Sequence, residues 1–279
     1  MPSLGQKIAA VLVSAVLAFL ILAAGQIPWG VLLALNFRNN ASAVPWSVAA
    51  MAVVLWLMWQ YLGGKGWPRS TSEKRRRYLR ANHVPPRVFA LAFLSGVLAV
   101  VALAGYWIVF LQLVKTPANV LPDTSTFPLL NVVLVTAMSS LVSPICEEIG
   151  FRGYCQLILE SRFSGSAAVT LSSLLFMLAH ANHGLYWPKL TVYFLVGVVF
   201  GAIALLTNSI LTTLPVHIVG DVTFFVLIWP RDSARVLVTE GGAGKWFWVH
   251  VMQAVVFTAL ALVGFWQLKK QGERVLATA

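Results

Sequence analysis

Residues 128–159 read PLLNVVLVTAMSSLVSPICEEIGFRGYCQLIL. This run is mostly apolar and long enough to cross a bilayer, which takes about 20 residues of α-helix. Three charged residues, Glu147, Glu148 and Arg152, nevertheless lie inside it. A charge in the middle of a membrane costs roughly 2.5–3.5 kcal/mol even on the lenient insertion scale, so such side chains face other helices and are paired or used. The stretch therefore predicts a membrane helix with a functional interior.

The rest of the chain has the same character. Of its 279 residues, 59% are hydrophobic and 10% are charged, whereas an average soluble domain has about 25% charged residues. Apolar stretches lie near residues 8–30, 44–62, 88–114, 128–159, 165–184, 189–206, 209–229 and 247–268. We therefore expect an all-α, polytopic transmembrane helix bundle of about eight spans, with residues 1–279 forming a single membrane domain.

The formal net charge of +11 is best explained by topology. Basic residues of membrane proteins gather in cytoplasmic loops, so we expect membrane lipids as partners and no nucleic acid. The loop between the second and third spans contains Lys65, Arg69, Lys74, Arg75, Arg76, Arg77, Arg80 and Arg87. If this loop is cytoplasmic, an even number of spans places both termini in the cytoplasm too. The expected location is a bacterial-type cell membrane, crossed several times.

Helical geometry separates the ionisable residues of the span at 128–159. Glu148 and Arg152 are four residues apart, hence on one face, where they can form an ion pair. Arg152 lies about 140° around an α-helix from Glu147. We therefore interpret Glu148 and Arg152 as a structural clamp and Glu147 as the reactive carboxylate.

Two further spans contain ionisable residues that could meet Glu147. The midpoint of Glu147 and His180, (147 + 180)/2 = 163.5, falls in the turn at residues 161–165, so two antiparallel helices would place them at equal depth. His217 and Asp221 are four residues apart on the seventh span and share a face. The sequence predicts that all four side chains line one hydrated cavity within the membrane.

A neighbouring histidine is placed outside this set. His183 follows His180 by three residues and stands between Asn182 and Gly184. We expect it at the end of the helix, outside the primary site.

This combination of groups suits hydrolysis of a peptide bond. Glu147 would act as general base and take a proton from water, while His180 and His217 would stabilise the tetrahedral oxyanion. In a second version, Glu147, His180, His217 and Asp221 bind one divalent metal such as zinc, since two histidines and a carboxylate also form a catalytic zinc site. The sequence leaves open whether there is no cofactor or one metal ion.

Three motifs carry a resemblance to a known family. Glu147 to Arg152 match EExxxR, Phe176 to His180 match FxxxH, and His217 to Asp221 match HxxxN or HxxxD. The chain thereby resembles the CAAX protease and bacteriocin-processing (CPBP, or Abi) family of intramembrane endopeptidases, and in particular its type II CAAX prenyl endopeptidases.

The resemblance implies an eight-helix membrane endopeptidase with its catalytic core in residues 128–229. It places Glu147, His180, His217 and Asp221 in the active site, with Phe176, Glu148 and Arg152 supporting them. Position 221 is Asp where the prenyl endopeptidases of the family look to have Asn, so a donor amide is replaced by a possible acceptor. The substrate is expected to be a membrane-associated peptide or protein, and whether it is prenylated stays open.

Two other functions fit parts of the pattern. A proton-coupled membrane transporter also uses intramembrane Glu, His and Asp, but the sequence shows no paired broken helices in two halves. A noncatalytic membrane protein of the bacteriocin-immunity type would keep the fold, but the intact acid and histidines argue against it.

Overall fold

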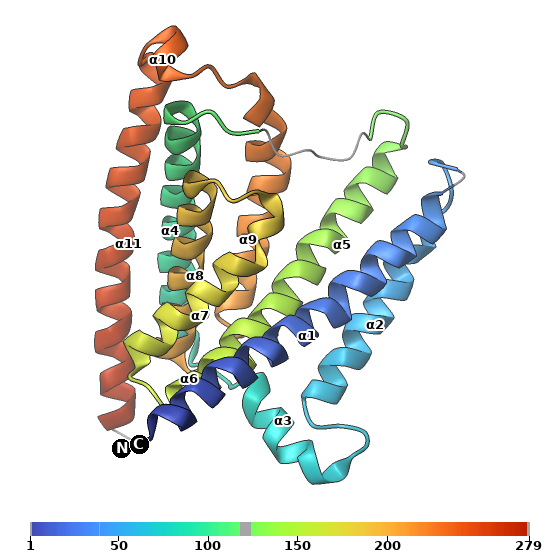
Figure 1. The fold of residues 1–279 in the computed structure, drawn as a ribbon, viewed down its shortest axis with the longest axis vertical. Helices are drawn as coiled ribbons and strands as arrows, with labels where there is room; N and C mark the ends of the chain where they lie inside the picture. Colours follow the sequence, from blue (N-terminus) through green and yellow to red (C-terminus); the bar gives the residue numbers. More distant parts are fainter. Residues whose placement is uncertain (1, 39, 118–123, 278–279) are drawn as a thin grey trace. The chain divides into compact units, whose positions relative to one another are not determined.

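The computed structural model describes residues 2–38, 40–117 and 124–277, and within these ranges every regular element is a helix (Figure 1). The all-α class is therefore confirmed. The main helices are α1 (Leu4–Phe37), α2 (Trp46–Leu62), α3 (Ser72–Leu79), α4 (Pro86–Leu113), α5 (Leu129–Glu147), α6 (Gln156–Glu160), α7 (Gly165–Ala179), α8 (Trp187–Thr207), α9 (Thr213–Thr223), α10 (Val238–Gly241) and α11 (Lys245–Ala277). Two π-helices, η2 (Glu148–Cys155) and η4 (Phe224–Ile228), and three 3₁₀ turns, η1 (Arg69–Thr71), η3 (Ala181–His183) and η5 (Trp229–Ala234), lie between them.

Most of these helices have the length and composition of membrane spans. Among the described residues, six segments qualify: Leu4–Phe37, Pro86–Leu113, Leu129–Glu160, Trp187–Thr207, Thr213–Asp232 and Lys245–Gln271. Two shorter helices, α2 and α7, are also apolar. Together they match the expected number of about eight spans, and the chain is a multi-pass integral membrane protein.

One span is shorter than the sequence predicted. Instead of continuing to residue 184, α7 ends at Ala179 and η3 follows. Gly184 has a φ of +100°, in the left-handed region that ends helices and that glycine adopts without strain. Nearby, Lys189 donates a hydrogen bond to the carbonyl of His183 over 3.3 Å. His180 is therefore the C-cap of α7 and not an interior residue of a helix.

Backbone contacts divide the chain into two compact units. Unit 1 comprises Met1–Ala81 and Leu121–Arg162, and unit 2 comprises Asn82–Val120 and Phe163–Ala279. Each unit has its own hydrophobic core. The single membrane domain expected over residues 1–279 stays a prediction.

The core of unit 1 joins α1, α2 and α5. Its buried residues are Trp29, Met51, Leu55, Met138, Val142 and Cys146. The indole Nε1 of Trp29 donates to the hydroxyl of Ser139 over 3.1 Å, so the one polar atom of this large side chain is satisfied within the apolar core. This packing holds α5, which carries Glu147 at its end.

The span that contains α5 changes its helical type halfway. It runs continuously from Leu129 to Glu160, and the π-helix η2 begins directly after Glu147. Pro144, in the last turn of α5, has no N–H to donate to the preceding turn. Bonding from residue i to i+5 in a π-helix gives a wider turn than in an α-helix, so side chains from Glu148 onward point in other directions than α-helical geometry predicts.

Two glycines let backbones of unit 1 approach η2 closely. A Cβ atom at Gly150 would lie 3.0 Å from the carbonyl oxygen of Ala18 in α1. A Cβ atom at Gly153 would lie 2.6 Å from the carbonyl oxygen of Tyr78 in α3. Real Cβ atoms essentially never come as close as 2.6 Å, so position 153 requires glycine, and a side chain at position 150 would make a tight contact that Ala18 has to relieve. The backbone of η2 therefore packs closely against α1 and α3.

Unit 2 is built around α4. One of its core clusters takes residues from α4, α8, α9 and α11, namely Val88, Ala92, Val100, Phe200, Ile203, Val216 and Leu268. A Cβ atom at Gly96 would lie 2.7 Å from the side chain of Val216, and one at Gly105 would lie 3.0 Å from the carbonyl oxygen of His250. α4 therefore contacts α9 and α11 closely, which fixes the helix that carries His217.

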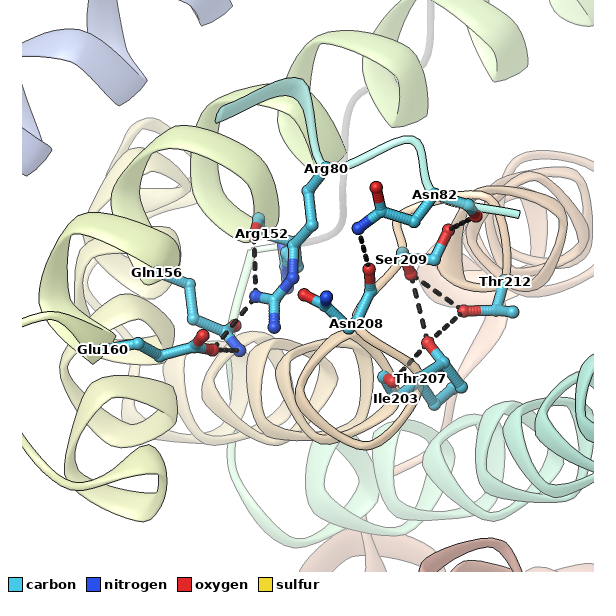
Figure 2. Close-up of polar contacts among 10 residues, drawn as sticks. All are labelled: Arg80, Asn82, Arg152, Gln156, Glu160, Ile203, Thr207, Asn208, Ser209 and Thr212. Carbon is cyan, nitrogen blue, oxygen red and sulfur yellow. Dashed lines mark hydrogen bonds and ion pairs between the residues drawn. The ribbon is translucent and has the colours of Figure 1, made fainter. Parts of the chain in front are cut away.

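A polar cluster closes the turn between α8 and α9 (Figure 2). Asn208 ends α8 with a φ of +49°. Asn82 donates to the carbonyl of Asn208 over 2.7 Å and accepts from the hydroxyl of Ser209 over 2.6 Å, while the hydroxyls of Thr207 and Thr212 lie 2.8 Å apart. These contacts fix where α9 begins.

The close approach at Gly153 can be tested by adding one methyl group. We expect Gly153→Ala to lower the stability of the protein by about 1–3 kcal/mol, as overpacking does, because the new Cβ would collide with a backbone oxygen. Gly30→Ala is the control, since a Cβ at Gly30 meets nothing within 4 Å. Thermal unfolding in detergent measures both variants. Equal midpoints for the two would contradict the packing described for η2.

Candidate active site

Glu147 lies at the end of α5 and is 4% exposed. The hydroxyl of Ser143, one helical turn earlier, donates to its Oε1 over 2.5 Å. A hydrogen bond of this length to a carboxylate holds the acid in one orientation. Sequence reasoning missed Ser143, although a polar residue four positions before an intramembrane acid is a signal that could have identified it.

The ion pair predicted between Glu148 and Arg152 is present. Oε1 of Glu148 lies 3.4 Å from Nη1 of Arg152, and the two side chains are 0% and 1% exposed. The angle of 140° expected between Glu147 and Arg152 assumed an α-helix. That assumption was wrong, because η2 is a π-helix. That the pair acts as a clamp for Glu147 stays a prediction.

Further contacts in unit 1 hold the backbone that carries Arg152 (Figure 2). Nη1 of Arg80 donates to the carbonyl of Arg152 over 3.3 Å and to Oε1 of Glu160 over 3.0 Å, and Gln156 donates to the same oxygen over 2.9 Å. Arg80 is 2% exposed, so this residue of the basic loop is a structural cation. Its role depends on a partner 72 positions away, which no local sequence pattern reveals.

In unit 2, His180 lies between two aromatic rings. Its ring centroid is 4.6 Å from that of Phe176 and 4.3 Å from that of Tyr193, with the Tyr193 ring stacked on it. Nδ1 of His180 is 2.9 Å from the carbonyl oxygen of Phe176. A carbonyl can only accept, so Nδ1 carries a proton, and in the neutral ring Nε2 has the lone pair.

His183 belongs to the same aromatic group. Its Nδ1 is 2.6 Å from the hydroxyl of Tyr193, and its ring is 5.7 Å from that of His180. Lys189, which is 2% exposed, donates to the carbonyl of His183. Sequence reasoning left His183 out and missed Tyr193 and Lys189. A lysine and a tyrosine four residues apart at the start of an apolar span were the available signal.

His217 and Asp221 share a face of α9, as their spacing predicted. Nε2 of His217 lies 3.5 Å from Oδ1 of Asp221. The buried ring of His217 packs 4.4 Å from the ring of Phe200 and 6.2 Å from that of Phe176. Phe176 therefore contacts both His180 and His217, so unit 2 gathers these two histidines around one phenylalanine.

The predicted site residues divide between the two units. Unit 1 contains Glu147, and unit 2 contains His180, His217 and Asp221. Within either unit, the described residues include no group of three or more His, Cys, Asp and Glu side chains placed to hold a metal ion. The predicted meeting of Glu147 with the histidines, and a metal site that uses all four residues, draw on both units and stay predictions.

The buried ion pair of η2 makes a sharp test possible. We expect Glu148→Gln to lower stability by about 3–5 kcal/mol, because it removes the carboxylate that forms the buried ion pair with Arg152. The double variant Glu148→Gln with Arg152→Met, which contains neither charge, should be more stable than the single variant. Unfolding in detergent measures both, with Glu73→Gln as a control for an exposed acid. A double variant that is less stable than the single one would contradict this account.

Part of the chain matches a known protein family. Residues 129–223 match the family model of type II CAAX prenyl endopeptidases, Rce1-like. No curated protein and no solved structure matches the chain. The matched residues run from the start of α5 to the end of α9 and contain all three motifs. Over this region the chain is similar to the type II CAAX prenyl endopeptidases, which confirms the resemblance predicted from the motifs.

Proposed function

We propose that the chain is an intramembrane endopeptidase that hydrolyses a peptide bond of a membrane-associated peptide or protein. The observation that carries this proposal is the family match over residues 129–223, because it includes every ionisable residue that the sequence placed in the site. Glu147 and His217 are also buried within apolar spans, where ionisable side chains are rare and mark functional sites.

Glu147 is the proposed general base. Ser143 donates to Oε1 and so fixes the direction of the carboxylate, which would take a proton from the attacking water. Such a base has to be preorganised, because a carboxylate that rotates freely spends most of its time away from the water. The short hydrogen bond supports this assignment.

The tautomer of His180 refines its proposed role. Since Nδ1–H donates to the carbonyl of Phe176, the neutral ring offers a lone pair at Nε2. Nε2 can accept a hydrogen bond from the water that Glu147 activates. Donation from Nε2 to an oxyanion would require the protonated ring, so we assign His180 to the water in preference to the oxyanion.

His217 is the better candidate for stabilising the oxyanion. In the protonated form of the His217 ring, which has an N–H on both nitrogens, the N–H at Nε2 would face the carboxylate of Asp221. One N–H then donates to Asp221 and the other, at Nδ1, would donate to the negative oxygen of the tetrahedral intermediate. In this role the Asp at position 221 acts through His217, and an amide donor at 221 is not needed.

A zinc version uses the same side chains. Two imidazoles and a carboxylate are a set that zinc accepts, and a histidine whose second nitrogen donates to a backbone carbonyl, as Nδ1 of His180 does, is typical of a metal ligand. Zinc, when bound, supplies Lewis-acid polarisation of the carbonyl and an activated water. In this version His180 and His217 would hold the ion, and Glu147 would still receive the proton.

We predict that Glu147→Gln abolishes cleavage and leaves folding intact, because the amide keeps the shape of the side chain but cannot accept the proton. The measurement is cleavage of a panel of membrane-anchored peptides, prenylated and unprenylated, by purified protein in detergent. Glu240→Gln is the matched control, since Glu240 is exposed and lies outside the proposed site. Retained cleavage by a folded Glu147→Gln protein would refute the general-base assignment.

For the metal question, we expect cleavage to survive exhaustive chelation, because Glu147, His180 and the pair of His217 with Asp221 supply both a base and an oxyanion donor. Activity and bound metal are measured on the same chelated sample. Loss of cleavage on chelation, with recovery when zinc is added back, would establish the zinc version instead. The Glu147→Gln protein gives the background rate of cleavage, both in the chelated sample and in the sample to which zinc is added back.

A further inference from the structure

The segment of unit 1 that follows α2 presents a dense group of basic side chains. We call residues 65–79 the basic platform; it contains η1 and α3. Its exposed cationic residues are Lys65, Arg69, Lys74, Arg76 and Arg77. Glu73 is its single acid. The outer surface of the platform is therefore strongly positive.

A buried arginine gives the platform a fixed shape. Arg75 is 6% exposed, and its guanidinium stacks 4.2 Å from the ring centroid of Tyr61 at the end of α2. One Nη atom donates to the carbonyl of Pro68 over 3.2 Å and to the hydroxyl of Thr71 over 2.6 Å. The other donates to the carbonyl of Lys65 over 3.0 Å. The loop that carries the exposed cations is thus tied to one central side chain.

The platform begins where a membrane helix ends. α2 has 17 residues, which is about 26 Å of α-helix, close to the thickness of the hydrocarbon core of a bilayer. Lys65 follows the last residue of α2 by three positions, so a bilayer crossed by α2 would have its headgroups at the depth of the platform. Trp67 within it is 86% exposed, and tryptophan at headgroup depth is typical of membrane interfaces.

Positive-inside topology alone does not explain this construction. The topological rule counts basic residues in a loop and requires no folded frame. Here Arg75 is buried to organise the loop, and the exposed cations stand on both sides of an exposed tryptophan. A preorganised surface of this kind lowers the entropic cost of binding several phosphates at once.

We propose that the basic platform is a binding surface for anionic phospholipids. Its lysines and arginines would pair with headgroup phosphates of one leaflet, and Trp67 would insert among the headgroups. The platform also packs on η2, since the carbonyl of Tyr78 meets Gly153 and the rings of Tyr78 and Tyr154 are 5.3 Å apart. Bound lipid would therefore hold η2 at a fixed depth. This inference is independent of the reaction proposed above.

A local reporter can test the proposal. Both native cysteines are buried, so Ser70→Cys, at an exposed position of the platform, provides one accessible thiol for a donor dye. Two samples of the labelled protein are prepared in phosphatidylcholine bilayers. One contains a small fraction of phosphatidylglycerol with an acceptor dye on its acyl chain, and the other contains the same fraction of phosphatidylcholine with the same dye. The ratio of energy transfer to the two acceptors measures local enrichment of the anionic lipid.

We expect transfer to phosphatidylglycerol to exceed transfer to phosphatidylcholine and the excess to disappear at high salt. Each basic residue near an anionic surface contributes roughly fivefold to binding, so Lys74→Gln, Arg76→Gln and Arg77→Gln together should bring the ratio close to that of random mixing. Arg38→Gln, Lys115→Gln and Lys245→Gln remove the same charge from exposed positions outside the platform. This control should keep the enrichment.

Three results would overturn the proposal. The first is equal energy transfer to both lipids by the parent protein, and the second is equal loss of enrichment in the two triple variants. The third is that inorganic phosphate displaces phosphatidylglycerol more than chloride does at the same ionic strength. The last result would indicate a site for free phosphate. Arg75→Leu gives a second check, because it removes no exposed charge but releases the loop. A folded Arg75→Leu protein with unchanged enrichment would contradict the role of Arg75 in organising the basic platform.

Discussion

The ion pair between Glu148 and Arg152 is the constraint on which the architecture of unit 1 depends. Both side chains are almost completely buried within an apolar span, and neither charge would be tolerated there alone. Holding them together requires η2 to stay at one place and in one conformation. The close contacts of Gly150 with α1 and of Gly153 with α3, and the hydrogen bond from Arg80 to the carbonyl of Arg152, all serve this requirement.

The change from α-helix to π-helix has a direct consequence for the proposed base. Glu147 is the last residue of α5, and the residues of η2 that follow it lie on wider turns. Ser143 therefore orients Glu147 from the α-helical side, while Glu148 turns toward Arg152 on the other. Ser143 is thus a partner of Glu147, while Arg152 forms the ion pair with Glu148 and also interacts electrostatically with Glu147. A second π-helix, η4, follows α9 shortly after Asp221, and π-helical turns are frequent at functional sites.

In unit 2, aromatic rings position the two histidines of the proposed site. His180 lies just beyond the end of α7. Its ring is positioned by Phe176, by Tyr193 and by the hydrogen bond from Nδ1 to the carbonyl of Phe176. His217 is inside α9 and is positioned by Phe200 and by Asp221. Phe176 touches both histidines. Rigid, apolar neighbours limit the motion of each imidazole and leave its nitrogens to determine the chemistry.

The sequence by itself determined the all-α class, the approximate spans and the local pairs, because each depends on periodicity along one helix. Glu148 with Arg152 and His217 with Asp221 were readable from a spacing of four residues. Only the tertiary structure decided the π-helical turn after Glu147, the end of α7 before His180, and the partners Arg80 and Tyr193. Those features arise where backbones and side chains from distant parts of the chain come into contact, and a linear pattern contains no record of such contacts.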